Sequence, residues 1–264
     1  MTNSVQALFL SHGGGPLPLL GDPGHAEMVA CLQGIAARMP RPRAIVVASA
    51  HWEASQPTLT VGAQPPLIYD YYGFPEAAYS IRYPCPGDPV LAQTIRDLLD
   101  EAGMHPVSDA ARGFDHGVFV PLKIMYPEAG IPCVQVSLLA SLDPAEHLRM
   151  GQALGRLGED ILLVGSGFSF HNLRAFFAAE TPESRERNRA FEVWLHETCT
   201  RADYSEAERE RRLVHWAAAP GARFCHPREE HLLPLHVCYG AARTACRESF
   251  ELRIMNRQAS MYLW

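Results

Sequence analysis

The sequence predicts a single α/β domain, residues 1–264, with a mostly parallel central sheet flanked by helices. Apolar runs rich in β-branched residues alternate with segments of helical period, which is typical of βαβ units. Two of these runs, residues 44–50 and 160–165, have the composition of strands buried on both faces. No internal repeat or change of composition marks a domain boundary, so we expect one domain.

The first expected strand, residues 5–10, is ended by Gly13, Gly14, Gly15 and Pro16. Other strands are expected at 44–50, 57–62, 133–138 and 160–165, and a terminal pair at 250–255 and 261–264. Helices are expected at 24–38, 89–102, 121–126, 144–157, 182–200, 205–216 and 229–242, where apolar positions follow the helical period. Residues 64–87 form a long loop rich in proline and aromatic residues, which predicts a wall or lid over a pocket.

The composition excludes several classes of protein. Acidic residues outnumber basic ones, 29 to 23, and there is no dense Lys/Arg run, so no nucleic-acid partner is expected. No apolar stretch approaches the roughly 20 residues that span a bilayer, and the N-terminus lacks the pattern of a signal peptide. The seven cysteines include no C-x-x-C pair, which argues against disulfides and zinc–thiolate sites. We expect a cytoplasmic protein with no membrane contact.

Three histidines follow three of the expected strands. His12 follows the first, His51 the second, and His171 comes shortly after the strand at 160–165. Ligands of open α/β sheets bind at the carboxyl ends of the strands, so these side chains are expected to meet in one crevice. The neighbouring glycines do not form a nucleotide-binding loop or a hydrolase nucleophile elbow.

A fourth cluster of polar residues stands before an apolar helical stretch, at residues 225–235. Either His226, Glu230 or His231 could point into the crevice, whereas Glu229 fits a role at the start of a helix. Neutral imidazoles bind iron, zinc and copper, and two histidines with a carboxylate form the site of non-haem iron oxygenases. His12 and His51, with either His231 or Glu230, would therefore hold a metal and leave open positions for catalysis.

Six motifs give the chain a resemblance to a known family. They are SHGGGP at 11–16, SAHWE at 49–53, YDYYGFP at 69–75, FDHGVFVPL at 114–122, GSGFSFHNL at 165–173 and HPREEHLLPL at 226–235. In order and spacing they resemble the DOPA 4,5-dioxygenase-like branch of the class III extradiol dioxygenases, within the LigB-type superfamily. The resemblance covers essentially the whole chain.

The resemblance implies an oxidoreductase that uses O2 to open the ring of a small aromatic diol, a DOPA-like catechol, and incorporates both oxygen atoms. It implies Fe(II) as the active metal, with Zn(II) able to occupy the site in purified protein. By position, His12, His51 and His231 match the metal ligands, and Glu230 is the alternative third ligand. His171 matches the active-site histidine, either as acid/base or as a fourth ligand, and His116 matches a catalytic histidine in the substrate pocket.

Further expectations concern the substrate pocket. Tyr71, Tyr72 and Phe74 would cover the ring, and Arg82 would pair with a substrate carboxylate. Residues 168–170, Phe-Ser-Phe, are bulkier than the resemblance implies and would narrow the pocket. Two alternatives are a zinc-dependent hydrolase on the same site and a metal-binding relative without catalysis.

Overall fold

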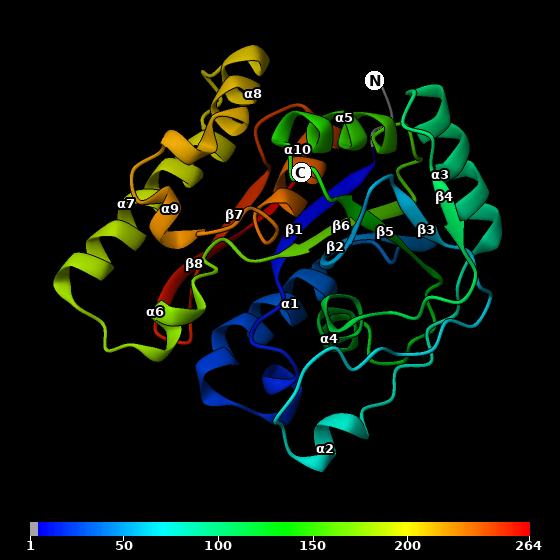
Figure 1. Ribbon diagram of the computed structural model, residues 1–264, viewed down its shortest axis with the longest axis horizontal. Helices are drawn as coiled ribbons and strands as arrows, with labels where there is room; N and C mark the ends of the chain where they lie inside the picture. The colour runs from blue at the N-terminus through cyan, green and yellow to red at the C-terminus, as the bar shows by residue number, and fades with distance from the viewer. Residues whose placement is uncertain (1–4) are drawn as a thin grey trace.

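The computed structural model describes residues 5–264 and holds an eight-stranded sheet at its centre (Figure 1). The strands run β4-β3-β5-β2-β6-β1-β8-β7 across the sheet. Their bounds are β1 Gln6–Ser11, β2 Ala44–Ala54, β3 Thr58–Thr60, β4 Val107–Asp109, β5 Cys133–Leu139, β6 Ile161–Gly167, β7 Glu248–Ile254 and β8 Arg257–Leu263. The α-helices are α1 Ala26–Arg38, α2 Glu76–Tyr79, α3 Pro89–Glu101, α4 His116–Met125, α5 Pro144–Leu154, α6 Leu173–Phe177, α7 Pro182–Thr200, α8 Glu206–Val214, α9 Ala222–Cys225 and α10 Leu233–Ala242.

The middle of the sheet is parallel, which confirms the expected α/β class. Strand β6 pairs in parallel with both β1 and β2, and β2 pairs in parallel with β5. Strand β8 pairs with β1 in the antiparallel direction, and β7 pairs with β8 as the outermost strand on that side of the sheet. The carboxyl ends of β1, β2 and β6 therefore lie side by side at one edge of the sheet.

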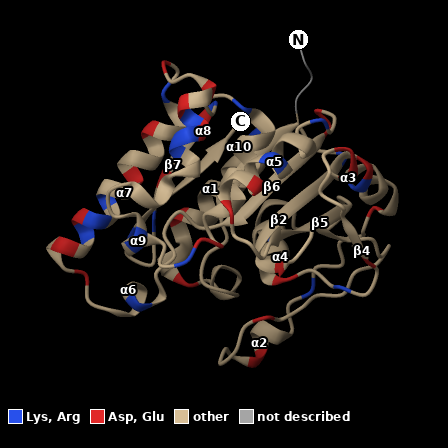
Figure 2. Ribbon diagram, turned by 45° about the horizontal axis from the view of Figure 1, so that its top comes forward, with Lys and Arg blue, Asp and Glu red and all other residues tan. Residues whose placement is uncertain are grey.

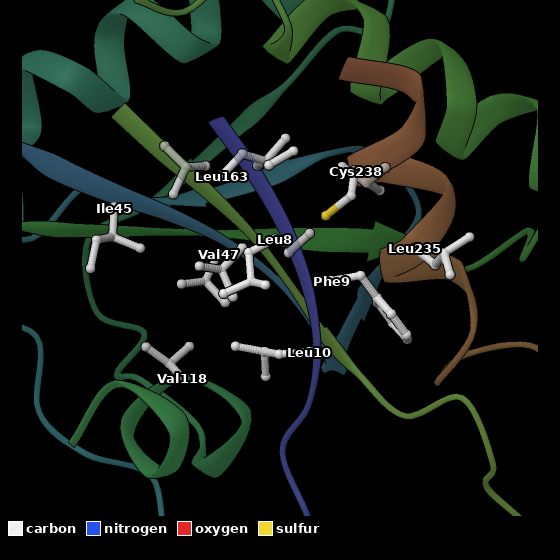
Figure 3. Packing of buried hydrophobic residues seen from close by; sticks show 14 of the residues in the cluster. Leu8, Phe9, Leu10, Ile45, Val47, Val118, Leu163, Leu235 and Cys238 are labelled. Carbon is white, nitrogen blue, oxygen red and sulfur yellow. The ribbon is translucent and has the colours of Figure 1, made fainter. Parts of the chain in front are cut away.

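Helices cover both faces of the parallel strands (Figure 1). Helices α5 and α10 pack together on one face, where α10 contacts β1, β2 and β6. Helices α1 and α4 lie on the other face. Figure 3 shows the alternation along β1: Leu10 lies toward Val118 of α4, whereas Phe9 lies toward Leu235 of α10. All four side chains are fully buried, so the core lies on both faces of the sheet.

Several boundaries differ from the sequence-based expectations. Helix α4 begins at His116 rather than at 121 and runs through Pro121, while β4 is a three-residue strand that was not predicted. Helix α10 begins at Leu233 rather than at 229, because Pro234 in its first turn suits a helix start. Strand β8 begins at Arg257, and a two-residue turn joins it to β7.

The charged residues are unevenly spread over the fold. Figure 2 shows them gathered on α3 and on the flank formed by α7 and α8, with few on the central strands. Within residues 5–264, no helix has the length and apolar character needed to cross a bilayer.

Candidate active site

His12 leaves the end of β1 in a fixed orientation. Its backbone N–H donates to the carbonyl of Gly167 (3.1 Å), which continues the pairing of β1 with β6. Its Nδ1 lies 3.0 Å from the hydroxyl of Ser166, and that hydroxyl donates to the carbonyl of Gly117 in α4. The imidazole is therefore held through Nδ1, and Nε2 faces the crevice.

His51 lies within β2 rather than after it. The pairing of β2 with β5 shifts register between Ser49 and Glu53, and such a bulge redirects the side chains within it. The backbone N–H of His51 donates to the hydroxyl of Ser49 (3.2 Å). The result brings Nε2 of His51 to 3.1 Å from Nε2 of His12.

His231 reaches the same place from the turn that precedes α10. Its ring centroid lies 5.2 Å from that of His12 and 5.1 Å from that of His51. The carbonyl of His231 accepts a hydrogen bond from the N–H of Phe168 (2.9 Å). At Gly167 a Cβ would overlap that carbonyl, so glycine permits the close approach of this turn to β6.

His171 stacks on His231, and one carboxylate contacts both rings. The two ring centroids are 3.3 Å apart and the planes differ by 12°. Oε1 of Glu230 lies 3.0 Å from Nδ1 of His231 and 3.3 Å from Nδ1 of His171. Burial works to raise the pKa of Glu230, but its contacts with the two imidazoles outweigh burial and hold that pKa far below its usual range. Glu230 is thus an ionised partner of both rings.

His116, the first residue of α4, completes the cluster and is hydrogen-bonded to Asp70. Oδ1 of Asp70 accepts from the backbone N–H of His116 (3.0 Å) and lies 2.8 Å from its Nδ1. Oδ2 lies 3.5 Å from Nδ1 of His51. Burial works to raise the pKa of Asp70, but the hydrogen bonds from His116 outweigh it and the pKa is lowered. No sequence motif assigned Asp70 a role, although it lies in the YDYYGFP segment.

A third carboxylate, that of Asp115, lies next to the cluster. Asp115 is fully buried and accepts hydrogen bonds from the hydroxyl of Ser49 (2.8 Å), from the amide of Gln135 and from Arg112 (3.2 Å). Burial raises the pKa of Asp115. Because Ser49 also bonds to the backbone of His51, this network ties the bulge of β2 to the start of α4.

The clustered imidazoles are suited to binding a metal. Burial, and then the neighbouring histidines, hold the pKa of His12 and of His51 well below the usual value, and burial lowers that of His231 to about 3. These rings are therefore neutral at physiological pH, as metal ligands must be. The donor atoms of His12, His51 and His116 lie within 4.8 Å of one another, as do those of His171, Glu230 and His231. The ring contacts of His231 join the two groups.

A pocket of about 780 Å³ opens beside the cluster. His171 and Glu230 line it together with Phe224, Pro227 and residues of α6. Its volume is in the range of small-molecule sites. The pocket brings His171 into contact with a space that a substrate can enter.

Several residues expected at the substrate do not line the pocket beside His171. Phe168 and Phe170 are buried in the core against Phe176 and do not line it. Tyr72 is 89% exposed and is not among the residues that line this pocket. Arg82 is exposed and donates to the hydroxyl of Tyr69 (3.1 Å), so it does not reach the pocket beside His171.

Other residues of the expected site have structural roles. Tyr71 packs edge-on against His116, with ring centroids 5.7 Å apart, and the ring of Tyr71 also packs edge-on against Phe74. His226 is fully buried, and its Nε2 lies 2.6 Å from the carbonyl of Ser169. Glu229 pairs with Arg223 (2.7 Å) and precedes the helix instead of lying within it.

The match to a family of aromatic ring-opening dioxygenases and to extradiol relatives shows a metal-dependent extradiol dioxygenase, and the clustered histidines are compatible with metal binding. The family described as the catalytic LigB subunit of aromatic ring-opening dioxygenase matches residues 7–260, and the chain belongs to that family.

Curated relatives carry matching names. The chain is 44% identical to a protein named dioxygenase tasH from Hapsidospora irregularis, over 89% of this chain and 77% of that one. It is 38% identical to a 4,5-DOPA dioxygenase extradiol from Beta vulgaris (91% and 88% covered) and 37% identical to one from Escherichia coli strain K12 (90% and 85%). Among solved structures, an uncharacterized protein from Escherichia coli K12 matches with a TM-score of 0.77 and 31% identity, covering 98% of this chain and 99% of that one. The family favours ring cleavage over the hydrolase alternative.

Proposed function

We propose that this dioxygenase opens the ring of a DOPA-like catechol at the cluster, with His12, His51 and His231 holding one Fe(II) ion. The site would lie at the carboxyl ends of β1, β2 and β6. The observation that carries the proposal is the convergence of these three neutral imidazoles, with the Nε2 atoms of His12 and His51 only 3.1 Å apart. Imidazole donors with open positions fit a catalytic iron site.

His231 fits the third ligand position better than its two neighbours. Oε1 of Glu230 already contacts Nδ1 of both His171 and His231, which suits a carboxylate that orients imidazoles. His116 is held through Nδ1 by Asp70, and its ring centroid lies 3.9 Å from that of His51, whereas His171 stacks on His231. The carboxylate of Glu230 thus orients the proposed metal ligand His231, and His116 is available to contact the substrate.

His171 has the surroundings of the general base. When bound, the metal supplies the redox chemistry that cleaves the ring with O2, which none of these side chains can supply. His171 lines the pocket and contacts Glu230 through Nδ1, so its Nε2 is free to accept a proton from a catechol hydroxyl. The same nitrogen would return that proton as the ring opens. Both oxygen atoms of O2 enter the product, so no external reductant is required.

His116 would stabilise negative charge on the substrate oxygens. Nδ1 of His116 faces Asp70. For Nε2 to donate a second hydrogen bond, the ring must be an imidazolium, and the carboxylate of Asp70 compensates its charge. A fixed donor aimed at developing charge is worth several kcal/mol in a closed site. Tyr71 packs on His116 and holds it in place.

The ligand assignment predicts a contrast in metal content. His231→Ala is expected to lose Fe(II) after anaerobic loading, whereas His116→Ala and His171→Ala keep it near one ion per chain and lose turnover. Atomic absorption on the three variants and the parent protein measures this. Full loading of His231→Ala with loss in His116→Ala would replace the proposed set by His12, His51 and His116.

The reaction itself is tested by oxygen uptake. Anaerobically Fe(II)-loaded protein is mixed with DOPA, protocatechuate and unsubstituted catechol, and O2 consumption is followed with product absorbance. Uptake matched by a yellow ring-opened product is expected with at least one diol. Full iron occupancy without uptake for any diol would refute the proposed activity.

A further inference from the structure

We infer that Arg174 binds the side-chain carboxylate of the substrate and sets the preference for a charged over a neutral diol. This inference rests on the proposed function and names a specificity-determining residue of that site. It starts from the pocket beside His171, whose wall includes Arg174, Arg228 and Arg257. Glu230 is the one carboxylate among the described residues that line it.

Two of these arginines already have partners. Arg228 donates to both carboxylate oxygens of Glu53 (2.6 and 2.7 Å) and lies 3.3 Å from Glu230. Arg257 donates to the carbonyl of Ala175 and lies 3.8 Å from Glu180. Neither guanidinium is free to bind a ligand directly.

Arg174 is exposed and makes no hydrogen bond or ion pair to any of residues 5–264. It lies on α6, which appears with a basic position in Figure 2. The side chain of Asn172 fixes this short helix, because its amide donates to the carbonyl of Phe224 (2.7 Å) and its oxygen accepts from the N–H of Ala175 (3.1 Å). The backbone that carries Arg174 is therefore anchored to the pocket wall.

The buried guanidinium of Arg257 strengthens the preference for an anion. It is 2% exposed, its Nε has no hydrogen-bond partner, and its nearest carboxylate is at 3.8 Å. A buried charge with such a distant partner leaves positive potential in its surroundings. Among the described residues that line the pocket, Arg174 is thus a free cation and Arg257 an incompletely compensated one.

The rest of the pocket fits the remainder of such a substrate. Phe224, Pro227 and the alanines of the α6 segment offer apolar contact to a ring and a short alkyl chain. His171 lies at the end of the pocket where the diol would react, and Arg174 lies three residues further along the sequence. An arginine fork binds a carboxylate through two parallel hydrogen bonds, which gives orientation as well as affinity.

The test compares 3-(3,4-dihydroxyphenyl)propionate with its neutral amide. In the Fe(II)-loaded parent protein, kcat/KM is expected to favour the acid. Arg174→Gln is expected to lower kcat/KM for the acid by about 10- to 100-fold and to leave the amide within about twofold. Arg174→Lys, which keeps the charge but not the fork, is expected to recover part of the loss. Arg149→Gln on α5, which removes another exposed arginine without a partner, is the control and should change neither substrate.

Anaerobic calorimetry separates this inference from the proposed activity. Both diols are titrated into the parent protein and into Arg174→Gln, so turnover is not needed for the result. Tighter binding of the acid by the parent and its loss in Arg174→Gln would support the inference even if no diol consumed O2. Equal binding of acid and amide by the parent, or an equal effect of Arg174→Gln on both, would overturn it.

Discussion

Asp70 contacts two histidines of the cluster with one carboxylate. Oδ1 bonds twice to His116, and Oδ2 lies 3.5 Å from Nδ1 of His51. Carboxylates that bond to such imidazoles fix the ring orientation and the nitrogen that carries the proton. The side chain therefore positions a proposed metal ligand and a proposed catalytic residue together.

Asp70→Asn is expected to lower kcat for catechol cleavage by about 10- to 100-fold, because the amide cannot compensate a charged His116. KM should change little, and the Fe(II) content should stay near that of the parent, since all proposed ligands remain. Steady-state oxygen uptake and metal analysis measure both. Glu76→Gln, an exposed change at the start of α2, is the control. A variant with parental kcat would show that Asp70 has no positioning role.

At the scale of elements, the approach of α10 to β6 places His231. The turn before α10 comes so close to β6 that Gly167 contacts the carbonyl of His231, and Gly165 similarly faces Pro234. Any side chain at these positions would force the two elements apart. The packing of a helix on a strand thus sets the position of a proposed ligand.

Gly167→Ala is expected to reduce the free energy of unfolding by about 1–3 kcal/mol through overpacking. It should also weaken Fe(II) binding, because His231 must move with its backbone. Urea unfolding and metal titration measure the two effects. Gly34→Ala in α1 is the control, since the new methyl group would meet only the end of Arg38 and alanine favours a helix. Parental metal affinity in Gly167→Ala would contradict the link between the α10 packing and the site.

The sequence predicted the local features of this fold and missed those that depend on distant partners. His12, His51 and His171 could be found because each lies at or shortly after an apolar strand, and His231 because it stands at the start of an apolar stretch just before α10. Asp70 could not be found, because its contact with His116 joins a loop to a helix 46 residues away. The three residues of β4 are too short to give a strand pattern, and they pair only with β3 at the edge of the sheet.

For the molecule as a whole, one buried acid is expected to make stability depend on pH. Glu192 of α7 lies against β8, where it accepts a hydrogen bond from Ser260 (2.5 Å), and burial raises its pKa to about 7. The native state therefore keeps a proton that the unfolded chain releases above about pH 4.5. Stability from this group is complete at low pH and declines as pH rises to about 7, by about 3 kcal/mol.

Glu192→Gln is expected to remove this decline. In Glu192→Gln the free energy of unfolding should fall less between pH 5 and pH 8 than it does in the parent, because the amide does not titrate. Urea unfolding at both pH values measures it, with Glu186→Gln on the exposed side of α7 as the control. An identical pH dependence in parent and Glu192→Gln would show that Glu192 is not the group responsible.

The histidines of the cluster come from segments far apart in the sequence, from the end of β1 to the turn that precedes α10. During synthesis, His12 and His51 leave the ribosome long before His231 does, and they remain without it until α10 has packed on β6. A nascent chain therefore lacks the full donor set until the segment that carries His231 has been made and packed. Tight iron binding would follow the packing of α10 on β6, and metal retention would mark the molecules that have completed this step.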